Sequence, residues 1–167
     1  EFFGVTFDEG VTKDGEKGNY APYHQSQRSE IYQTYIKQMV RRGQAYPCFC
    51  TEEELNEIRE TQECLKENPG YYGKWAKHRN LSFEDGIRGT LMMPENDQDV
   101  VLLKANGIPT YHFAHVVDDH LMRTSHVVRG AEWLPSLPIH VELFNTLEWP
   151  LPVYCHTAQL MKMENGN

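Results

Sequence analysis

The sequence predicts an α/β fold at both ends of the chain, with a smaller α+β insertion near residues 46–105. Three observations lead to this fold class. Apolar residues recur with a helical period in two segments near the ends. The run "HVVRG" at 126–130 is typical of a short buried strand in a parallel sheet. A length of 167 residues with 40% hydrophobic content suffices for one sizeable core or two small ones.

The first helix is expected to follow an exposed, glycine-rich loop at 8–22. Its apolar residues recur in pairs four apart and form one stripe: Ile31, Tyr32, Tyr35, Ile36, Met39 and Val40. Ser26 is the predicted N-cap. Arg41 and Arg42 suit the negative C-terminal end of the helix dipole, and Gly43 suits its termination.

A second helix is expected from the sequence "TEEE" at 51–54. This pattern predicts a capping box, in which Thr51 caps the helix and Glu54 reaches back to the backbone of Thr51. Leu55, Ile58 and Leu65 would give the helix a thin apolar face, and "NPG" at 68–70 would end it.

Two strands are expected next, "RGTLMM" at 88–93 and "DVVLLK" at 99–104, forming a hairpin around the turn "PENDQD". After the strand at 126–130, Ser136 is the predicted cap of a third helix, with Pro138 in its first turn. The inward-facing residues of that helix would be Leu143, Phe144 and Leu147.

Composition restricts the class of partner and compartment. The net charge of −8 argues against a broadly basic nucleic-acid-binding surface, although a local basic patch can sit on an acidic protein. No apolar run approaches the roughly 20 residues needed to span a bilayer, and no secretory signal opens the sequence. We therefore expect a cytosolic protein whose four cysteines are free thiols or metal ligands. The two ends, "EFFGVTFDEG" and "MKMENGN", indicate a fragment of a longer protein.

The segment from Val116 to Trp133 combines charge, histidine and β-branched residues. Arg129, Glu132 and Trp133 would lie at the carboxyl end of a parallel strand, where open α/β sheets bind ligands. A guanidinium can grip a carboxylate through two parallel bonds, Trp133 offers a flat wall for a ring, and Tyr111 could supply a hydroxyl. The alternative is that Arg129 pairs with an aspartate at 118 or 119 and that Trp133 is a core residue.

The sequence "DDH" at 118–120 resembles a metal-binding pattern, because carboxylates and an imidazole are common ligands. If the segment is a strand, however, neighbouring side chains point to opposite faces and cannot easily meet one ion. We therefore favour a hydrogen-bond network for these residues.

The sequence also resembles a known family. "GIPTYHFAHVVDDHLMRTSHVVRGAEWLPSLPIHVELF" is similar to the second half of the catalytic domain of bacterial-type glutamyl-tRNA synthetases, which are class I aminoacyl-tRNA synthetases. The block "DEG…GNYAPYHQSQRSEIYQTYIKQMVRRGQAYPCFCTEEEL" is similar to the segment that leads into the family's inserted acceptor-binding domain. The resemblance implies two halves of a Rossmann-like catalytic domain, at 1–45 and 106–167, around an inserted α+β domain at 46–105.

The family activates glutamate with ATP and Mg²⁺ to form glutamyl-adenylate, then transfers the glutamyl group to tRNA(Glu). The resemblance implies that Tyr111, His115 and Arg129 line the glutamate pocket, and that Glu132 and Trp133 lie at the ATP nucleoside. It also implies a cytoplasmic monomer. The family usually has Asn where this chain has His115. Since imidazole titrates near neutral pH, we expect glutamate affinity to depend on pH.

Two motifs of the family, of the His-Ile-Gly-His and Lys-Met-Ser-Lys-Ser types, are absent from these 167 residues. They stabilise charge on the ATP phosphates, so the chain alone is expected to be inactive. The chain also looks short between Asp85 and Gly86. Two alternative functions stay open: an RNA-binding module, or a paralogue that glutamylates a modified tRNA base. Nothing in the sequence shows whether tRNA for glutamine is also charged.

Some members of the family hold a structural zinc at the start of the insertion. By resemblance the ligands here would be Cys48, Cys50 and His78, with Cys64 as a fourth candidate. We favour the alternative of buried thiols without zinc, since a single Cys-x-Cys is weaker than paired Cys-x-x-Cys motifs.

A basic and aromatic cluster is the predicted contact for the tRNA acceptor end, because cations pair with phosphates and rings stack on unpaired bases. Its central members are Lys74, Trp75, Lys77 and Arg79. The alternative is a solvated face above a small aromatic core.

Overall fold

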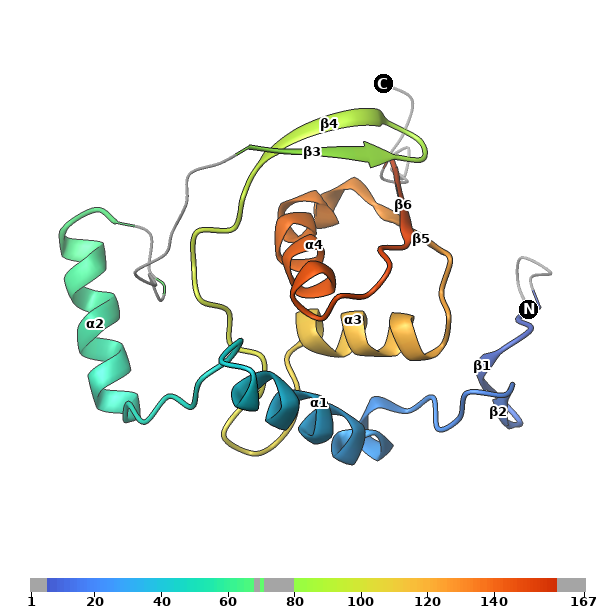
Figure 1. The fold of residues 1–167 in the computed structure, drawn as a ribbon, viewed down its shortest axis with the longest axis horizontal. Helices are drawn as coiled ribbons and strands as arrows, with labels where there is room; N and C mark the ends of the chain where they lie inside the picture. The colour runs from blue at the N-terminus through green and yellow to red at the C-terminus, as the bar shows by residue number, and fades with distance from the viewer. Residues whose placement is uncertain (1–5, 68–69, 71–79, 159–167) are drawn as a thin grey trace, which may run out of the picture. The chain divides into compact units, whose positions relative to one another are not determined.

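The computed structural model describes residues 6–67, 70 and 80–158, and these fall into two compact units (Figure 1). The first unit comprises residues 1–45 and 101–124, and the second comprises 46–100 and 125–167. Both contain helices and strands, as the predicted fold class requires. No helix in the described part of the chain is long and apolar enough to cross a membrane. The division into 1–45, 46–105 and 106–167 stays a prediction.

The first unit is built on two helices, α1 (Ser29–Arg41) and α3 (Tyr111–Leu121), which lie side by side in Figure 1. Its fully or nearly buried side chains come from both helices: Tyr32, Met39, Phe113, Ala114, Val116 and Val117. Before α1 come a short antiparallel hairpin, β1 (Gly10–Thr12) and β2 (Gly15–Lys17), and a 3₁₀ turn, η1 (Gln25–Gln27). The hairpin lies in the segment that was predicted to be a loop.

The predicted N-cap of α1 was wrong. Ser26 lies inside η1, and α1 begins three residues later with Arg28 at the N-cap and no side-chain cap bond. The reason is tertiary, since the Arg28 side chain is held by the carbonyls of Tyr20 and Pro22 and by Asp118. The predicted stop at Gly43 is confirmed. Gly43 has a φ of 70°, which fits a glycine at a helix C-terminus.

Residues 118–120 lie on a helix, so the strand assumed for them was wrong. The inward positions Phe113, Val116 and Val117 are three and four residues apart, which is a helical spacing. The β-branched valines obscured that period in the sequence.

The second unit holds two small sheets. Strands β5 (His126–Gly130) and β6 (Val153–Thr157) are parallel, with Arg129 opposite His156, so the predicted parallel strand is confirmed. The expectation that this strand is buried was wrong, since β5 has no buried residue and Val128 is 67% exposed. Between them lie η2 (Ala131–Ser136) and α4 (Leu137–Thr146). Ser136 is the N-cap of α4 as predicted, although its side chain makes no cap bond. The predicted inward residues of this helix are buried, namely Leu143, Phe144 and Leu147.

The other sheet is an antiparallel hairpin of β3 (Asn80–Asp85) and β4 (Gly89–Pro94). The predicted hairpin of 88–93 with 99–104 was therefore wrong. Residues 99–104 form no strand, and Leu103 makes only an isolated bridge to Pro109. Strand β4 pairs with β3 because apolar side chains of both strands join one core cluster with Leu137 and Tyr154, in particular Phe83, Leu91 and Met93.

Helix α2 (Glu52–Cys64) carries the predicted capping box. Thr51 accepts a hydrogen bond from the Glu54 backbone at 3.2 Å and donates its own backbone N–H to the Glu54 carboxylate at 2.7 Å. The helix ends at Cys64, before the predicted "NPG" stop. Its predicted apolar face does not enter a core, since the helix has no buried residue and Ile58 is 43% exposed.

Candidate functional site

The first group of predicted site residues lies on one side of α3. The rings of Tyr111 and His115 stack with centroids 5.7 Å apart and an interplanar angle of 15°. One turn further along, the Asp119 carboxylate lies 3.1 Å from Nδ1 of His115. Tyr111 is 47% exposed, whereas His115 and Asp119 are largely buried. Helix α3 therefore presents an aromatic pair whose imidazole is oriented by a carboxylate.

Asp118 forms the hydrogen-bond network that we favoured for this segment. It accepts from Arg28 Nε at 2.8 Å and from the Tyr32 hydroxyl at 2.7 Å. Burial raises the pKa of Tyr32, and the hydrogen bond to the Asp118 carboxylate raises it further, so the hydroxyl stays a proton donor. These contacts fix α3 against α1. Within the same unit, Asp119 lies against His115, and the alternative pairing of Arg129 with either aspartate stays a prediction.

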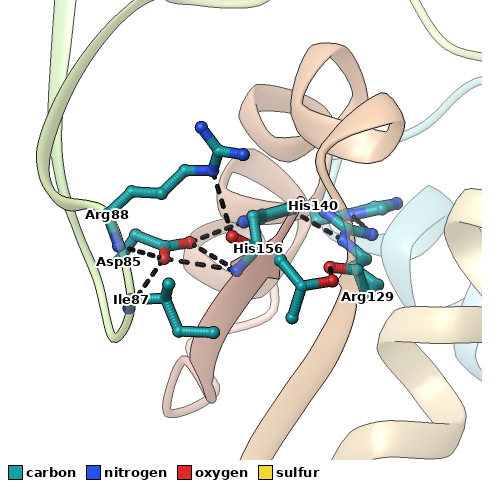
Figure 2. A network of polar contacts seen from close by, with 7 residues as sticks. Asp85, Ile87, Arg88, Arg129, His140 and His156 are labelled. Carbon is teal, nitrogen blue, oxygen red and sulfur yellow. Dashed lines mark hydrogen bonds and ion pairs between the residues drawn. The ribbon is translucent and has the colours of Figure 1, made fainter. Parts of the chain in front are cut away.

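Arg129 lies near the end of β5 and is held by two histidines (Figure 2). Its Nε donates to Nε2 of His156 at 3.0 Å, and its Nη1 donates to Nδ1 of His140 at 3.3 Å. Its guanidinium carbon lies 4.8 Å from the ring centre of Tyr154, a cation–π distance. The remaining nitrogen, Nη2, is buried and has no hydrogen-bond partner among the described residues. The arrangement leaves one guanidinium nitrogen for an external acceptor.

His156 is itself anchored by Asp85. The Asp85 carboxylate lies 2.6 Å from Nδ1 of His156, and both side chains are fully buried. The same carboxylate accepts the backbone N–H groups of Ile87 and Arg88, each at 2.9 Å, and that of His156 at 3.2 Å. Burial raises the pKa of Asp85, but the hydrogen bonds outweigh it and lower the pKa to about 2. Asp85 is therefore ionised at neutral pH.

The two predicted ATP-site residues lie on η2, directly after β5. Trp133 is 37% exposed, so the alternative that it is a core residue was wrong. A β-carbon at Gly130 would collide with the Glu132 carboxylate, so the glycine leaves room for that side chain beside the strand end.

The glutamate pocket as a whole stays a prediction. Tyr111 and His115 belong to the first unit, and Arg129, Glu132 and Trp133 to the second, so each group is described within its own unit. The predicted tRNA contacts lie outside the described residues, namely Lys74, Trp75, Lys77 and Arg79. His78, a predicted zinc ligand, also lies outside them.

The cysteines at the start of the insertion are exposed, so the expectation of buried thiols was wrong. Cys48, Cys50 and Cys64 are exposed and form no disulfide in the part of the chain that the structure describes. The first two lie in an irregular segment ahead of α2 that packs into neither core cluster nor sheet. A hydrogen bond with Cys48 raises the pKa of the Cys50 thiol. Within the described ranges, no three metal-binding side chains converge, and the predicted ligand set with His78 is not tested.

Three residues of the Arg129 site were missed in the sequence: Asp85, His140 and His156. The alternation of "NLSFED" at 80–85 is a strand signal that would have placed Asp85 at the start of a turn. "VYCHT" at 153–157 is a short β-rich run with a histidine near its carboxyl end. Its pairing with β5 could not be read from the sequence.

The family comparison covers most of the chain. The family model for tRNA synthetases class I (E and Q), catalytic domain, matches residues 8–79 and 73–167. The chain belongs to this family. The structure therefore describes part of a class I synthetase catalytic domain.

Similar proteins agree with this assignment. A glutamate–tRNA ligase of Acetivibrio thermocellus is 59% identical over 195 residues, which cover 99% of this chain and 36% of that protein. One of Clostridium beijerinckii is 47% identical, over 99% of this chain and 35% of that protein. The crystal structure of a glutamate tRNA ligase from Elizabethkingia meningosepticum in complex with its amino acid matches with a TM-score of 0.79 and 33% identity, over 90% of this chain and 36% of that one. The synthetase chain thus spans about a third of the length of these relatives.

The comparison also bears on the length of the insertion. The alignment to the first relative runs over 195 residues, whereas this chain has 167, so at least 28 aligned positions have no counterpart here. At Asp85 and Gly86 the structure has a three-residue turn between β3 and β4. That the missing residues fall at this point stays a prediction.

Proposed function

We propose that the intact protein attaches glutamate to tRNA(Glu) through a glutamyl-adenylate, with ATP and Mg²⁺ as co-substrate. The observation that carries the proposal is the 59% identity to a glutamate–tRNA ligase along nearly the whole chain. The related crystal structure, described as a complex with its amino acid, supports the same substrate.

Arg129 supplies the physical basis for binding the amino acid. Its two hydrogen-bond acceptors are imidazoles, so neither of these bonds places a carboxylate directly on the guanidinium. The unpartnered Nη2 is buried, and a buried donor without an acceptor costs about 1–3 kcal/mol. A ligand carboxylate would remove that cost and gain a charge-assisted hydrogen bond. The site therefore favours an anionic ligand over a neutral one.

Tyr111 and His115, on α3, are proposed from the family resemblance alone to contact the bound glutamate. Their stacked rings form an apolar wall with polar edges, which suits the aliphatic part and the amine of an amino acid. Protonation of the His115 imidazole would form an ion pair with Asp119, which lies 3.1 Å from Nδ1, and would change the charge beside a bound ligand. We expect glutamate affinity to change between pH 5.5 and 8, and a flat affinity would contradict that expectation.

The remaining assignments rest on the family resemblance. Trp133 and Glu132 are proposed to contact the ATP nucleoside, and the exposed indole of Trp133 is suited to stacking on adenine. The acceptor end of tRNA is proposed to contact the basic cluster that contains Lys74 and Arg79. We further propose a cytoplasmic monomer and do not favour a zinc ion at Cys48 and Cys50.

Aminoacylation by the intact gene product tests the proposal. The assay contains labelled glutamate, ATP and, separately, tRNAs for glutamate and glutamine. Charging of tRNA(Glu) is expected, and the second tRNA shows whether the enzyme discriminates. An RNA-binding module would give neither charging nor glutamate-dependent pyrophosphate exchange. Exchange without charging of either tRNA would favour a paralogue that glutamylates a modified tRNA base.

The 167-residue chain alone is expected to lack activity, because it contains neither ATP motif. Glutamate-dependent pyrophosphate exchange by this polypeptide, above the background of a mock purification, would contradict that expectation.

A further inference from the structure

We propose that His156, locked by Asp85, is a positioning residue that sets the guanidinium of Arg129 for binding the substrate carboxylate. The proposal rests on the function proposed above, because it assigns Arg129 to the amino-acid site. Neither Asp85 nor His156 would contact the substrate; both would act through Arg129.

The hydrogen-bond pattern fixes the tautomer of His156. A guanidinium can only donate, so Nε2 of His156, at 3.0 Å from Arg129 Nε, must be the acceptor. The ring proton therefore lies on Nδ1, from which it is donated to the Asp85 carboxylate at 2.6 Å. The result is a chain of two donated hydrogen bonds, from Arg129 to His156 and from His156 to Asp85 (Figure 2).

Asp85 is fixed independently of the ring. Three backbone N–H groups, those of Ile87, Arg88 and His156, point at its carboxylate from the β3–β4 turn and from β6. An ionised carboxylate accepts hydrogen bonds and cannot donate one. Asp85 thus enforces the Nδ1–H tautomer and prevents a ring flip that would place a donor opposite Arg129.

The strand register places the partners so that only one end of the guanidinium stays open. Arg129 and His156 are direct neighbours across the parallel pair β5–β6. The ring of Tyr154 is nearly parallel to those of His140 and His156, with centroids 6.3 Å and 6.1 Å away and interplanar angles of 11°. Arg129 lies over this ring and is held at Nε by one imidazole and at Nη1 by the other. Among the described residues Nη2 has no hydrogen-bond partner, and we assign it to the ligand.

An imidazole suits this role better than a carboxylate does. A carboxylate in direct contact would orient the guanidinium but would also neutralise it, and so would compete with the substrate. A neutral imidazole orients the same group and leaves its positive charge for the ligand. The Asp85 charge acts one ring further away, on the opposite side of His156.

The structure therefore predicts different effects for similar substitutions. In Asp85→Asn, the new amide can donate to Nδ1, which moves the ring proton to Nε2 and sets two donors against each other at Arg129. His156→Leu removes the acceptor outright. His156→Gln keeps an amide oxygen that Arg129 can reach, and is the conservative variant expected to rescue. Val128→Thr is the matched control, because Val128 precedes Arg129 on β5 and is 67% exposed.

The experiment measures glutamate-dependent pyrophosphate exchange by the intact gene product and its variants. The KM for glutamate is expected to rise roughly tenfold to hundredfold in Asp85→Asn and His156→Leu, as for a misplaced binding group. The KM for ATP should stay within twofold in every variant. The KM for glutamate in His156→Gln should fall between those of wild type and His156→Leu, and that of Val128→Thr should match wild type. Glutamate KM values within twofold of wild type in both Asp85→Asn and His156→Leu would overturn the proposal.

A second readout does not depend on the stability of any variant. Nitrogen NMR of ring-labelled histidine in the wild-type protein, with His156 assigned through His156→Gln, is expected to show the Nδ1–H tautomer. An Nε2–H tautomer would overturn the proposal. Failure of the proposed function is recognised separately, because the wild-type protein would then show no glutamate-dependent pyrophosphate exchange and Arg129→Gln could not lower it further. If Arg129→Gln abolishes glutamate binding while the Asp85 and His156 variants keep it, only the positioning role is refuted.

Discussion

Replacing Arg28 by methionine should destabilise the chain more than any change to an exposed arginine. Arg28 is almost fully buried, with a side chain 3% exposed, and it bonds Asp118, Tyr20 and Pro22. Methionine keeps the length of the side chain but removes all its donors. Asp118 is then left with the Tyr32 hydroxyl as its remaining partner in this network. Because Asp118 sits on α3, the change also loosens the helix that carries Tyr111 and His115.

The size of the effect follows from burial. Removing one partner of a buried ion pair costs about 3–5 kcal/mol, because the other charge stays behind. The Asp118 side chain is 23% exposed and can be partly rehydrated, which places the cost at the lower end, about 3 kcal/mol. Tyr32→Phe, which removes one hydrogen bond to a charged group, should cost about 1.5 kcal/mol.

Urea unfolding of the chain at pH 7, followed by circular dichroism, measures these costs. Arg42→Met is the matched control, because Arg42 lies exposed at the C-cap of the same helix and should change stability by no more than about 0.5 kcal/mol. The double variant Arg28→Met/Asp118→Leu should be less destabilised than the sum of its singles. A loss of less than about 1 kcal/mol in Arg28→Met, or a loss equal to that of Arg42→Met, would refute the reasoning.

Three further predictions concern stability. Arg123 ends α3 in the left-handed conformation, with a φ of 57°, so Arg123→Gly should stabilise the chain by roughly 0.5–1 kcal/mol in thermal unfolding, and destabilisation would count against it. The pKa of Asp85 is about 2 in the folded state, against 3.8 ordinarily. Its contribution to the free energy of unfolding is therefore complete above pH 3.8 and is lost as the pH falls through 2. Asp85→Asn should thus lower the free energy of unfolding by about 2 kcal/mol at pH 7. The difference in unfolding free energy from wild type should narrow below about pH 4, and a difference that does not change with pH would contradict this. Burial raises the pKa of Glu142 despite its bond from Asn96 at 2.7 Å, so ionisation costs stability above its ordinary pKa of 4.5. Glu142→Gln should raise the melting temperature at pH 7 but not at pH 4. A melting temperature below that of wild type at pH 7 would contradict this, because it would mean that the ionised carboxylate stabilises the fold.

Elements with local signals could be predicted from the sequence. The capping box at Thr51 and the glycine stop at Gly43 depend on residues within one helical turn, and both are present. The parallel strand at 126–130 was recognised from its β-branched run. These features need no knowledge of distant contacts.

Elements that depend on pairing could not be predicted. Strand β4 could have paired with the apolar run at 99–104 or with the segment at 80–85. It pairs with the latter, β3, because side chains of both strands pack in one core cluster with Phe83. Similarly, Arg129 could be proposed as an anion-binding group from its place at a strand end. Its actual partners, His140 and His156, are brought to it by the fold, 11 and 27 residues along the chain. The bond from Arg28 to Asp118 could not be predicted either, because the two residues lie 90 positions apart in the sequence and only the packing of α1 on α3 brings them together.

The measurement that tests the central claim most directly is aminoacylation of tRNA(Glu) by the intact gene product, with wild type and Arg129→Gln compared at several glutamate concentrations. The claim predicts that wild type charges the tRNA. It also predicts that Arg129→Gln, which loses the guanidinium with the buried Nη2, needs at least about tenfold more glutamate, equivalent to one charge-assisted hydrogen bond. Charging by Arg129→Gln at the wild-type glutamate concentration would contradict the assignment of Arg129, and absence of charging by wild type would contradict the proposed function itself.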